Sequence, residues 1–350
     1  MSEIADIFNE RLPALIENFV VREQQVKFAE SIASIISGGG NGLIEAGTGI
    51  GKTFGYLIPV MQSGDTAIVS TGTRNLQDQL FLKDLPKLAE LFPEKRLSLL
   101  KGRANYLCVH RMRTSLKVVA KGENLDRLVQ VRGWSSQTKT GDLTELLDPE
   151  EHPGIMRLVT STRDNCLGSR CPDFDQCPLY LARDRAAQSD VVVVNHHLLF
   201  ADLARQEDAL QSLLPRAGIV LVDEAHRVPD VARQFFGQQI SSGQMVELIR
   251  DTTTELALLG NDDPMTRQAI SELQAALDRL RDEIMASDIV DYSDWLQERS
   301  TASVVNLDLA LNELISHLDR VAQRSVGLQQ VLKRSLRLAD LFALLSEDLS

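Results

Sequence analysis

An α/β fold with a parallel sheet is predicted by two features of the 350-residue sequence. Short apolar runs of strand length occur at 66–70, 97–100, 191–194 and 219–222, and segments with helical character separate them. This alternation is typical of a doubly wound parallel sheet, because parallel strands need crossover connections. The last two runs contain no polar residue, so both are expected to be strands buried on two faces.

Further elements are expected in the first hundred residues. The apolar spacing over 15–37 predicts a helix, and three glycines that begin at Gly38 are expected to end it. Residues 43–44 are expected to form a short strand before a glycine-rich loop. Helices are then predicted over 52–61 and 76–85.

The alternation lapses over 103–185, which contains all four cysteines and few long apolar runs. An inserted subdomain is therefore expected there. From residue 240 onward, apolar side chains step by three and four, as in helices that pack against each other. They form two stripes, Ile270, Leu273, Leu277, Leu280 and Ile284, followed by Leu307, Leu311, Leu314, Leu318 and Val321.

Composition favours a cytoplasmic protein that makes no membrane contact. The chain is 43% apolar and 25% charged, which is ordinary for a globular protein. No basic and then apolar leader follows Met1, and the run 191–194 is too short to cross a bilayer. The net charge is −12, but residues 230–350 hold 20 acidic against 11 basic side chains. A local positive groove for nucleic acid elsewhere is therefore not excluded.

The most specific motif is a phosphate-binding loop, Glu45-Ala46-Gly47-Thr48-Gly49-Ile50-Gly51-Lys52-Thr53. It lies between a predicted strand and a predicted helix, the context that this motif requires. Its glycines allow backbone N–H groups to surround phosphate oxygens, and the helix N-terminus adds partial positive charge. Lys52 is expected to reach the β- and γ-phosphates of ATP, and the Thr53 hydroxyl to bind Mg²⁺. Ala46 stands where the strict pattern has glycine, and a small residue suffices there.

An acidic pair, Asp223 and Glu224, follows the apolar run 219–222. The carboxyl end of a buried strand is where doubly wound sheets bind ligands. Asp223 is expected to hold Mg²⁺, Glu224 to orient and deprotonate the attacking water, and His226 to belong to the nucleotide site. Two solvated acids at a strand end are the alternative, which the phosphate loop makes weaker. The two motifs predict an ATPase whose catalytic residues are Lys52, Asp223 and Glu224.

The four cysteines, Cys108, Cys166, Cys171 and Cys177, are candidates for one metal centre. In a reducing compartment, thiols favour metal binding over structural disulfides. Four thiolates suit either Zn²⁺ or a [4Fe–4S] cluster, and their spacing alone does not choose. Free cysteines are the third possibility.

Together these motifs resemble those of the XPD/DinG family of iron–sulfur superfamily 2 DNA helicases, and most of all its bacterial DinG/YoaA branch. Asp-Glu-Ala-His at 223–226 is similar to the family's motif II, the DEAH box. Segment 70–80 is similar to motif Ia, 101–108 to the segment with the first cluster ligand, and 195–199 to the segment before motif II. The resemblance covers about residues 20–240.

The resemblance implies a RecA-like P-loop domain with two excursions. Residues 1–102 and 188–239 would form the RecA-like domain, 103–187 an iron–sulfur cluster domain, and 240–350 an incomplete α-helical arch. The second RecA domain is expected to be absent, because no Gln-x-x-Gly-Arg-x-x-Arg motif occurs. The chain alone is then expected to bind Mg·ATP weakly, with neither appreciable ATPase nor unwinding activity.

The resemblance also implies cofactors and partners. It assigns a [4Fe–4S] cluster to the four cysteines, and it places Arg22 and Gln25 in the adenine-reading Q-motif, although Gln24 stands where relatives often have proline. It implies 5′ to 3′ movement on single-stranded DNA, unwinding at single-strand/double-strand junctions, and replication or repair proteins as partners.

Side chains near the cysteines are candidate DNA contacts. Phosphate contacts are possible at Arg103, Arg163 and Arg170, and base stacking at Tyr106, Trp134, Phe174 and Tyr180, although packing around the metal centre is favoured for the aromatics. His196 and His197 are expected to be buried hydrogen-bonding residues or neighbours of motif II rather than metal ligands.

Two other classes of function stay open. One is a non-enzymatic ATP- and DNA-binding regulatory module. The other is a zinc-bearing P-loop ATPase with a substrate other than DNA, which would be colourless, whereas an iron–sulfur protein is brown.

Overall fold

The structure is a computed structural model that describes residues 3–47, 49–118, 122–207, 212–236, 240–260, 263–287 and 302–347. The chain divides into two compact units. Unit 1 comprises Met1–Gly102 and Tyr180–Gly237, and unit 2 comprises Arg103–Leu179 and Gln238–Ser350. Among the described helices, none combines the length and apolar character needed to span a membrane.

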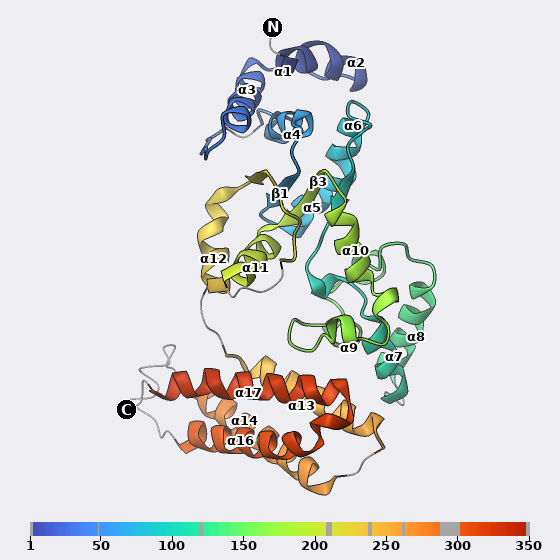
Figure 1. Cartoon of the computed structure of the whole chain (residues 1–350), viewed down its shortest axis with the longest axis vertical. Coiled ribbons are helices and arrows are strands. Elements are labelled where there is room, and N and C mark those ends of the chain that lie inside the picture. Colours follow the sequence, from blue (N-terminus) through green and yellow to red (C-terminus); the bar gives the residue numbers. More distant parts are fainter. Residues whose placement is uncertain are drawn as a thin grey trace. The chain divides into compact units, whose positions relative to one another are not determined.

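A four-stranded parallel sheet lies at the centre of unit 1 (Figure 1). Its strands lie in the order β2 (Leu97–Leu99), β3 (Val191–Asn195), β1 (Ala67–Thr71) and β4 (Ile219–Val222). Ala67 is in register with Val191 on one side and with Ile219 on the other, and Leu97 also pairs with Val191. The predicted parallel α/β fold is confirmed.

Helices surround this sheet. They are α1 (Glu3–Asp6), η1 (Ile7–Arg11), α2 (Leu12–Leu15), α3 (Glu23–Gly38), α4 (Lys52–Gln62), α5 (Arg74–Gln79), η2 (Leu80–Asp84), α6 (Leu85–Ala89), α11 (His196–Glu207), η7 (Ala225–Arg227) and α12 (Val228–Phe236). The buried side chains of Leu57, Val69 and Val193 join α4, β1 and β3 in one hydrophobic core. Helix α10 (Pro178–Ala187) spans the boundary between the two units.

The start predicted for the helix over 15–37 is wrong, whereas its predicted end is confirmed. The chain is interrupted before Glu23, because Asn18 has a φ of 59° and Arg22 is extended. Helix α3 ends at Gly38, and Gly39 then has a φ of 69°.

Two strand predictions need correction. Residues 43–44 form no strand, and the Leu43 side chain is 93% exposed. Two apolar residues between glycines bury too little surface to offset the loss of glycine conformational freedom. The strand β4 was expected to be buried on both faces, but it lies at the edge of the sheet and leaves Val220 54% exposed. The inner strand β3 is buried throughout, as predicted.

Short helices and turns form the cysteine-bearing part of unit 2. They are η3 (Arg103–Asn105), α7 (Val109–Val118), α8 (Glu123–Ser135), η4 (Leu143–Glu145), α9 (Pro153–Val159), η5 (Gly168–Arg170) and η6 (Phe174–Gln176). Leu107, Leu128 and Val159 belong to a small buried cluster against which Trp134 packs.

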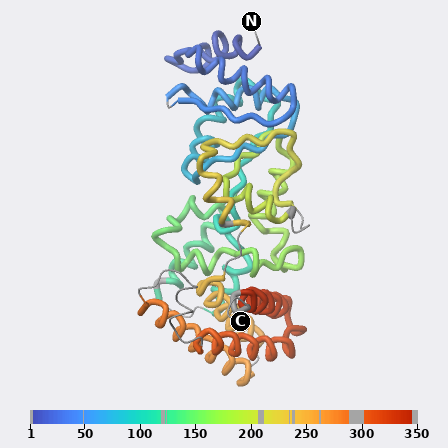
Figure 2. Tube along the Cα trace, turned by 90° about the vertical axis from the view of Figure 1, so that its left-hand side faces the viewer, coloured from blue at the N-terminus to red at the C-terminus, as the bar shows by residue number. Residues whose placement is uncertain are grey.

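Longer helices form the rest of unit 2. They are α13 (Ser242–Leu258), α14 (Pro264–Met285), α16 (Ala302–Val321), η8 (Ala322–Arg324) and α17 (Val326–Glu347). Figures 1 and 2 show them packed side by side. The two predicted apolar stripes lie in their shared core, apart from Ile284, which is exposed near the end of α14.

Candidate functional site

The predicted phosphate loop leads directly into α4, whose first residue is Lys52. Gly49 and Gly51 have φ values of 79° and 85°, in the left-handed region that favours glycine. A Cβ atom on Gly51 would lie 2.9 Å from the carboxamide carbon of Gln25. Glycine is therefore required at position 51 for its backbone conformation and for the close approach of Gln25. Thr48 lies outside the described residues.

Two side chains at the start of α3 hold the phosphate loop. The Gln25 Nε2 atom donates to the Gly51 carbonyl oxygen at 2.7 Å, and the Arg22 Nη1 atom donates to the Gly49 carbonyl oxygen at 2.6 Å. Gln25 is only 2% exposed. The carboxamide that the resemblance assigns to adenine is thus bonded to the loop backbone.

The acidic pair lies beside the phosphate loop. Lys52 Nζ is 3.6 Å from Glu224 Oε1, although the two residues are far apart in sequence. Glu224 has a φ of 54°, an uncommon conformation for a residue with a side chain, and His226 Nδ1 is 3.3 Å from its Oε2 atom. The structure therefore brings three predicted site residues, Lys52, Glu224 and His226, to one place.

Tyr56 links the two predicted magnesium ligands. Its hydroxyl donates to Asp223 Oδ2 at 3.2 Å and also hydrogen-bonds the Thr53 side chain. Burial raises the pKa of Tyr56, and the neighbouring Asp223 raises it further. Tyr56 is not among the residues that the sequence predicts for the site. The one available signal was a tyrosine one helical turn after Thr53.

Asp223 lies in an environment that disfavours its negative charge. Burial raises its pKa, and the adjacent Glu224 acts in the same direction, whereas the Tyr56 hydrogen bond and Lys52 lower it only in part. Two carboxylates that repel each other in a partly buried place are what a bound divalent cation stabilises. The residues present therefore fit a magnesium ion.

The two histidines before motif II differ in burial. His196 is fully buried, and its Nδ1 atom lies 2.7 Å from the Ser70 hydroxyl oxygen of β1. Burial lowers the pKa of its imidazole. His196 is thus a buried hydrogen-bonding residue, as predicted. His197 is exposed and lies edge-on to Phe235 at 6.0 Å, so the first of the two expectations, a buried side chain, is wrong for this residue.

The four cysteines gather in unit 2 as free thiols. Burial raises the pKa of Cys108 to about 11, and Cys166 and Cys177 contribute to that rise. Burial also raises the pKa of Cys171, again with contributions from Cys166 and Cys177. Thiolates that mutually disfavour ionisation need a cationic centre to be stable. The donor set therefore fits a metal or cluster that binds four thiolates.

A mixed set of donors lies beside Cys171. One ligand atom each from His110, Cys171 and Asp173 lie within 4.8 Å of one another. His110 Nδ1 is 3.3 Å from Asp173 Oδ2, and Arg113 also pairs with Asp173. Nitrogen, sulfur and oxygen donors together are a combination that Zn²⁺ accepts.

The candidate DNA-contacting residues have different exposures. Arg163, Arg170 and Tyr180 are exposed, Arg103 and Phe174 are partly buried, and Tyr106 is buried. Arg170 Nη1 donates to Gln329 Oε1 at 3.0 Å. Tyr106 therefore packs inside unit 2, whereas the exposed side chains stay accessible to a ligand.

The chain is similar to a known protein family and to several known helicases. The DEAD_2 family model matches residues 73–245. The chain is 37% identical over 346 residues to the ATP-dependent DNA helicase YoaA of Haemophilus influenzae, with 95% of this chain and 52% of that protein covered. The chain belongs to the XPD/DinG family of helicases. YoaA of Escherichia coli is 41% identical over 69% of this chain and 39% of its own length.

A third relative, the ATP-dependent DNA helicase DinG of Salmonella choleraesuis, is 30% identical over 62% of this chain and 33% of its own length. The chain thus spans about half the length of the H. influenzae relative and less of the other two.

Proposed function

We propose that unit 1 is a RecA-like motor domain that binds Mg·ATP for an ATP-dependent DNA helicase. The observation that carries this proposal is the approach of Lys52 Nζ to Glu224 Oε1 at 3.6 Å, and the hydroxyl of Tyr56 links Thr53 to Asp223 beside it. A phosphate-binding lysine and an acidic pair are the parts that phosphoryl transfer requires.

Each side chain has a distinct role in the proposed site. Thr53 and Asp223 would hold Mg²⁺, which neutralises phosphate charge when bound. Lys52 would bind the β- and γ-phosphates and stabilise the charge that develops on them. Glu224 would orient a water molecule and accept its proton as the bond to the γ-phosphorus forms. Tyr56 would keep Asp223 turned toward Thr53.

Nucleotide binding by the chain tests this site. Replacing Lys52 with Ala removes a charge-assisted hydrogen bond, which is worth roughly 1.5–3 kcal/mol, so affinity for a non-hydrolysable ATP analogue should fall by roughly 10–100-fold. Lys87→Ala removes an exposed lysine of α6 and serves as the control. Calorimetric titration in Mg²⁺ measures both. Equal affinities for the two variants would reject the proposed site.

We also infer that Cys108, Cys166, Cys171 and Cys177 hold a [4Fe–4S] cluster. The mutual effects of these thiols on their pKa values and the membership in the XPD/DinG family support this inference. The bound cluster would brace a segment that is built from short helices and turns. In a DNA helicase this braced segment would contact single-stranded DNA near the strand junction, through exposed residues such as Arg163 and Tyr180, with the helices from α13 onward as the arch.

Metal analysis after anaerobic purification tests the cluster. A [4Fe–4S] protein should contain about four irons and four acid-labile sulfides per chain and absorb visible light. Cys166→Ser should lower the iron content. The nearby His110, Cys171 and Asp173 favour one competing outcome, a colourless protein that contains zinc. Zinc without sulfide would reject the cluster and leave the nucleotide proposal standing.

A further inference from the structure

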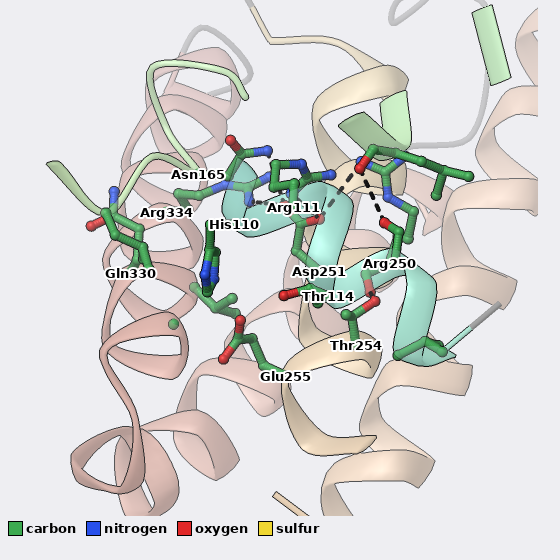
Figure 3. Close-up of a pocket in the computed structure, with 16 residues that line it drawn as sticks. His110, Arg111, Thr114, Asn165, Arg250, Asp251, Thr254, Glu255, Gln330 and Arg334 are labelled. Atoms are coloured by element: carbon green, nitrogen blue, oxygen red, sulfur yellow. Dashed lines mark hydrogen bonds and ion pairs between the residues drawn. The ribbon is translucent and has the colours of Figure 1, made fainter. Parts of the chain in front are cut away.

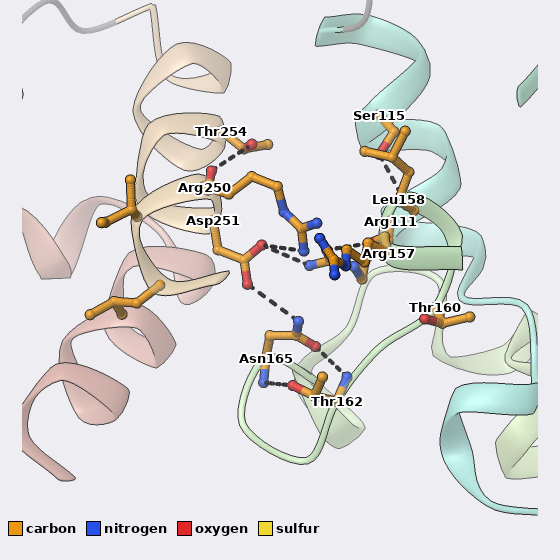
Figure 4. A network of polar contacts seen from close by, with 12 residues as sticks. Arg111, Ser115, Arg157, Leu158, Thr160, Thr162, Asn165, Arg250, Asp251 and Thr254 are labelled. Carbon is orange, nitrogen blue, oxygen red and sulfur yellow. Dashed lines mark hydrogen bonds and ion pairs between the residues drawn. The ribbon is translucent and has the colours of Figure 1, made fainter. Parts of the chain in front are cut away.

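Within unit 2, two long helices touch the segments that carry Cys108 and Cys166. Arg111 lies three residues after Cys108 on α7, and Asn165 directly precedes Cys166. Both side chains bond to Asp251 of α13, at 3.1 Å from Arg111 Nη1 and 3.2 Å from Asn165 Nδ2 (Figure 4). One carboxylate therefore holds both flanks of the cysteine site.

Asp251 is a buried ion-pair centre rather than a surface contact. Its side chain is 10% exposed, and Arg334 of α17 donates to its Oδ2 atom at 2.6 Å. Figure 3 shows these groups on the wall of a cavity of about 220 Å³ that is lined by α7, α13 and α17 together with Leu158, Asn165 and Leu167. A buried carboxylate with several charged partners is costly to disrupt, because removal of the acid leaves the arginines unpaired. The cysteine segment and the helices are thus joined by one shared charge.

Helix α17 holds the segment on both sides of Cys166 at three further points. Gln330 Nε2 donates to the Asp164 carbonyl oxygen at 2.6 Å, and Arg337 Nη1 lies 3.3 Å from Asp164 Oδ1. Gln329 accepts from Arg170, as described above. The loop also closes on itself, since Asn165 Oδ1 accepts from the Thr162 backbone N–H at 2.7 Å. Residues 162–170 are therefore fixed from one side by α17 and from another by Asp251.

We infer that α13 and α17 form a clasp, centred on Asp251, that positions Cys108 and Cys166 for their shared centre. Asp251 is a positioning residue in this arrangement, since it acts through Arg111 and Asn165 rather than on a metal. The clasp makes retention of the bound group depend on two helices that lie far beyond the last cysteine, Cys177, in the sequence, since α13 begins 65 residues and α17 149 residues after it. The inference that the clasp retains iron rests on the proposed [4Fe–4S] cluster. The inference that the clasp fixes residues 162–170 does not depend on the cluster.

Hydrogen exchange and iron loss together test the clasp. In Asp251→Asn, amides of residues 162–170 should exchange roughly 10–100-fold faster. The loss of a charged hydrogen bond raises the equilibrium constant for local opening by this factor, and exchange occurs from the open state. Visible absorbance should also bleach faster in the presence of an iron chelator. Asp278→Asn, the same change at an exposed position of α14, is the control and should match the wild type. Amide hydrogen exchange in the core between α14 and α16 is measured at the same time, because faster exchange there as well would indicate global unfolding.

A milder variant keeps the test decisive if Asp251→Asn does not fold. Gln330→Ala removes only the bond to the Asp164 carbonyl, and exchange over 162–170 should rise by roughly 2–10-fold. Unchanged exchange and bleaching in Gln330→Ala, and in Asp251→Asn where it folds, would overturn the clasp. If the wild type contains no iron, the cluster proposal fails, while the exchange rates still decide whether the clasp exists.

Discussion

Gly51 has two constraints, a left-handed backbone and the carboxamide of Gln25. Gly51→Ala should therefore strain the phosphate loop by roughly 1–3 kcal/mol and displace Gln25. Affinity for Mg·ATP analogues, measured by calorimetry, should fall by roughly 5–150-fold. Gly64→Ala is the matched control, because its φ is not positive and a Cβ there meets no atom within 4 Å. Wild-type affinity in Gly51→Ala would contradict the close packing of Gln25.

Tyr56 should act through the magnesium ligands. Tyr56→Phe keeps the ring and removes the hydroxyl that orients Asp223, a neutral bond worth about 0.5–1.5 kcal/mol. The Mg²⁺-dependent gain in nucleotide affinity should fall by roughly 2–10-fold, while affinity in excess EDTA stays unchanged. Tyr180→Phe, at an exposed position, is the control. A change that is equal with and without Mg²⁺ would show that Tyr56 acts on the fold instead.

The site residues that the sequence predicts are those that belong to short local motifs. Lys52 and Thr53 follow a glycine loop, and Asp223 and Glu224 follow an apolar strand, so spacing alone marks them. The contact between Tyr56 and Asp223 joins residues 167 positions apart and depends on how α4 lies beside β4. The order of residues within each motif carries no information on that packing.

At the scale of single elements, the apolar stripe of α16 makes a quantitative prediction. Leu314 is completely buried and Leu309, on the same helix, is 61% exposed. Leu314→Ala should lower the free energy of unfolding by roughly 2–5 kcal/mol, because it removes buried surface and leaves a cavity. Leu309→Ala should change it by less than about 0.5 kcal/mol. Urea unfolding measures both, and similar losses would contradict the helical packing.

Elements with strong periodicity were predictable, and short apolar runs were not. The stripes of α14 and α16 repeat over several turns, so a helix with one buried face is the only pattern that fits them. Residues 43–44 have strand-forming side chains, but a strand also needs a neighbour, and no described strand pairs with them. The apolar composition of residues 219–222 predicts the strand β4, but its exposed face follows from its position at the edge of the sheet.

At the scale of the whole molecule, the sequence predicted an insertion after residue 102 but not which segments share a unit. Unit 2 joins Arg103–Leu179 to Gln238–Ser350. The bond between Arg111 and Asp251 crosses 140 positions and involves two residue types that ordinarily lie on the surface. Nothing in the local pattern of α7 or α13 distinguishes these buried charges from solvated ones.

The clasp gives unit 2 two carboxyls whose pKa values move in opposite directions. Burial works to raise the pKa of Asp251, but Arg111 and Arg334 outweigh it and lower the pKa below its usual value. One turn later on α13, burial raises the pKa of Glu255, and its hydrogen bond from Ser325 offsets this only in part.

These directions predict opposite pH signatures for two charge-removing variants. Because the pKa of Asp251 is lower in the folded state, this group stabilises the fold at pH values above its unfolded pKa of about 3.9. That stabilisation is lost as the pH falls through the pKa of the folded state. Asp251→Asn should therefore be less stable than wild type at pH 7, and the difference between their free energies of unfolding should become smaller below about pH 4.

Because the pKa of Glu255 is higher in the folded state, this group stabilises the fold at pH values below its unfolded pKa of about 4.3. That stabilisation is lost as the pH rises through the pKa of the folded state. Glu255→Gln should thus be at least as stable as wild type at pH 7 and lose any advantage as the pH falls. Urea midpoints from tryptophan fluorescence test this in unit 2, whose residue ranges contain both tryptophans, Trp134 and Trp295. The same pH slope in both variants would mean that Asp251 does not hold its arginines as ion pairs.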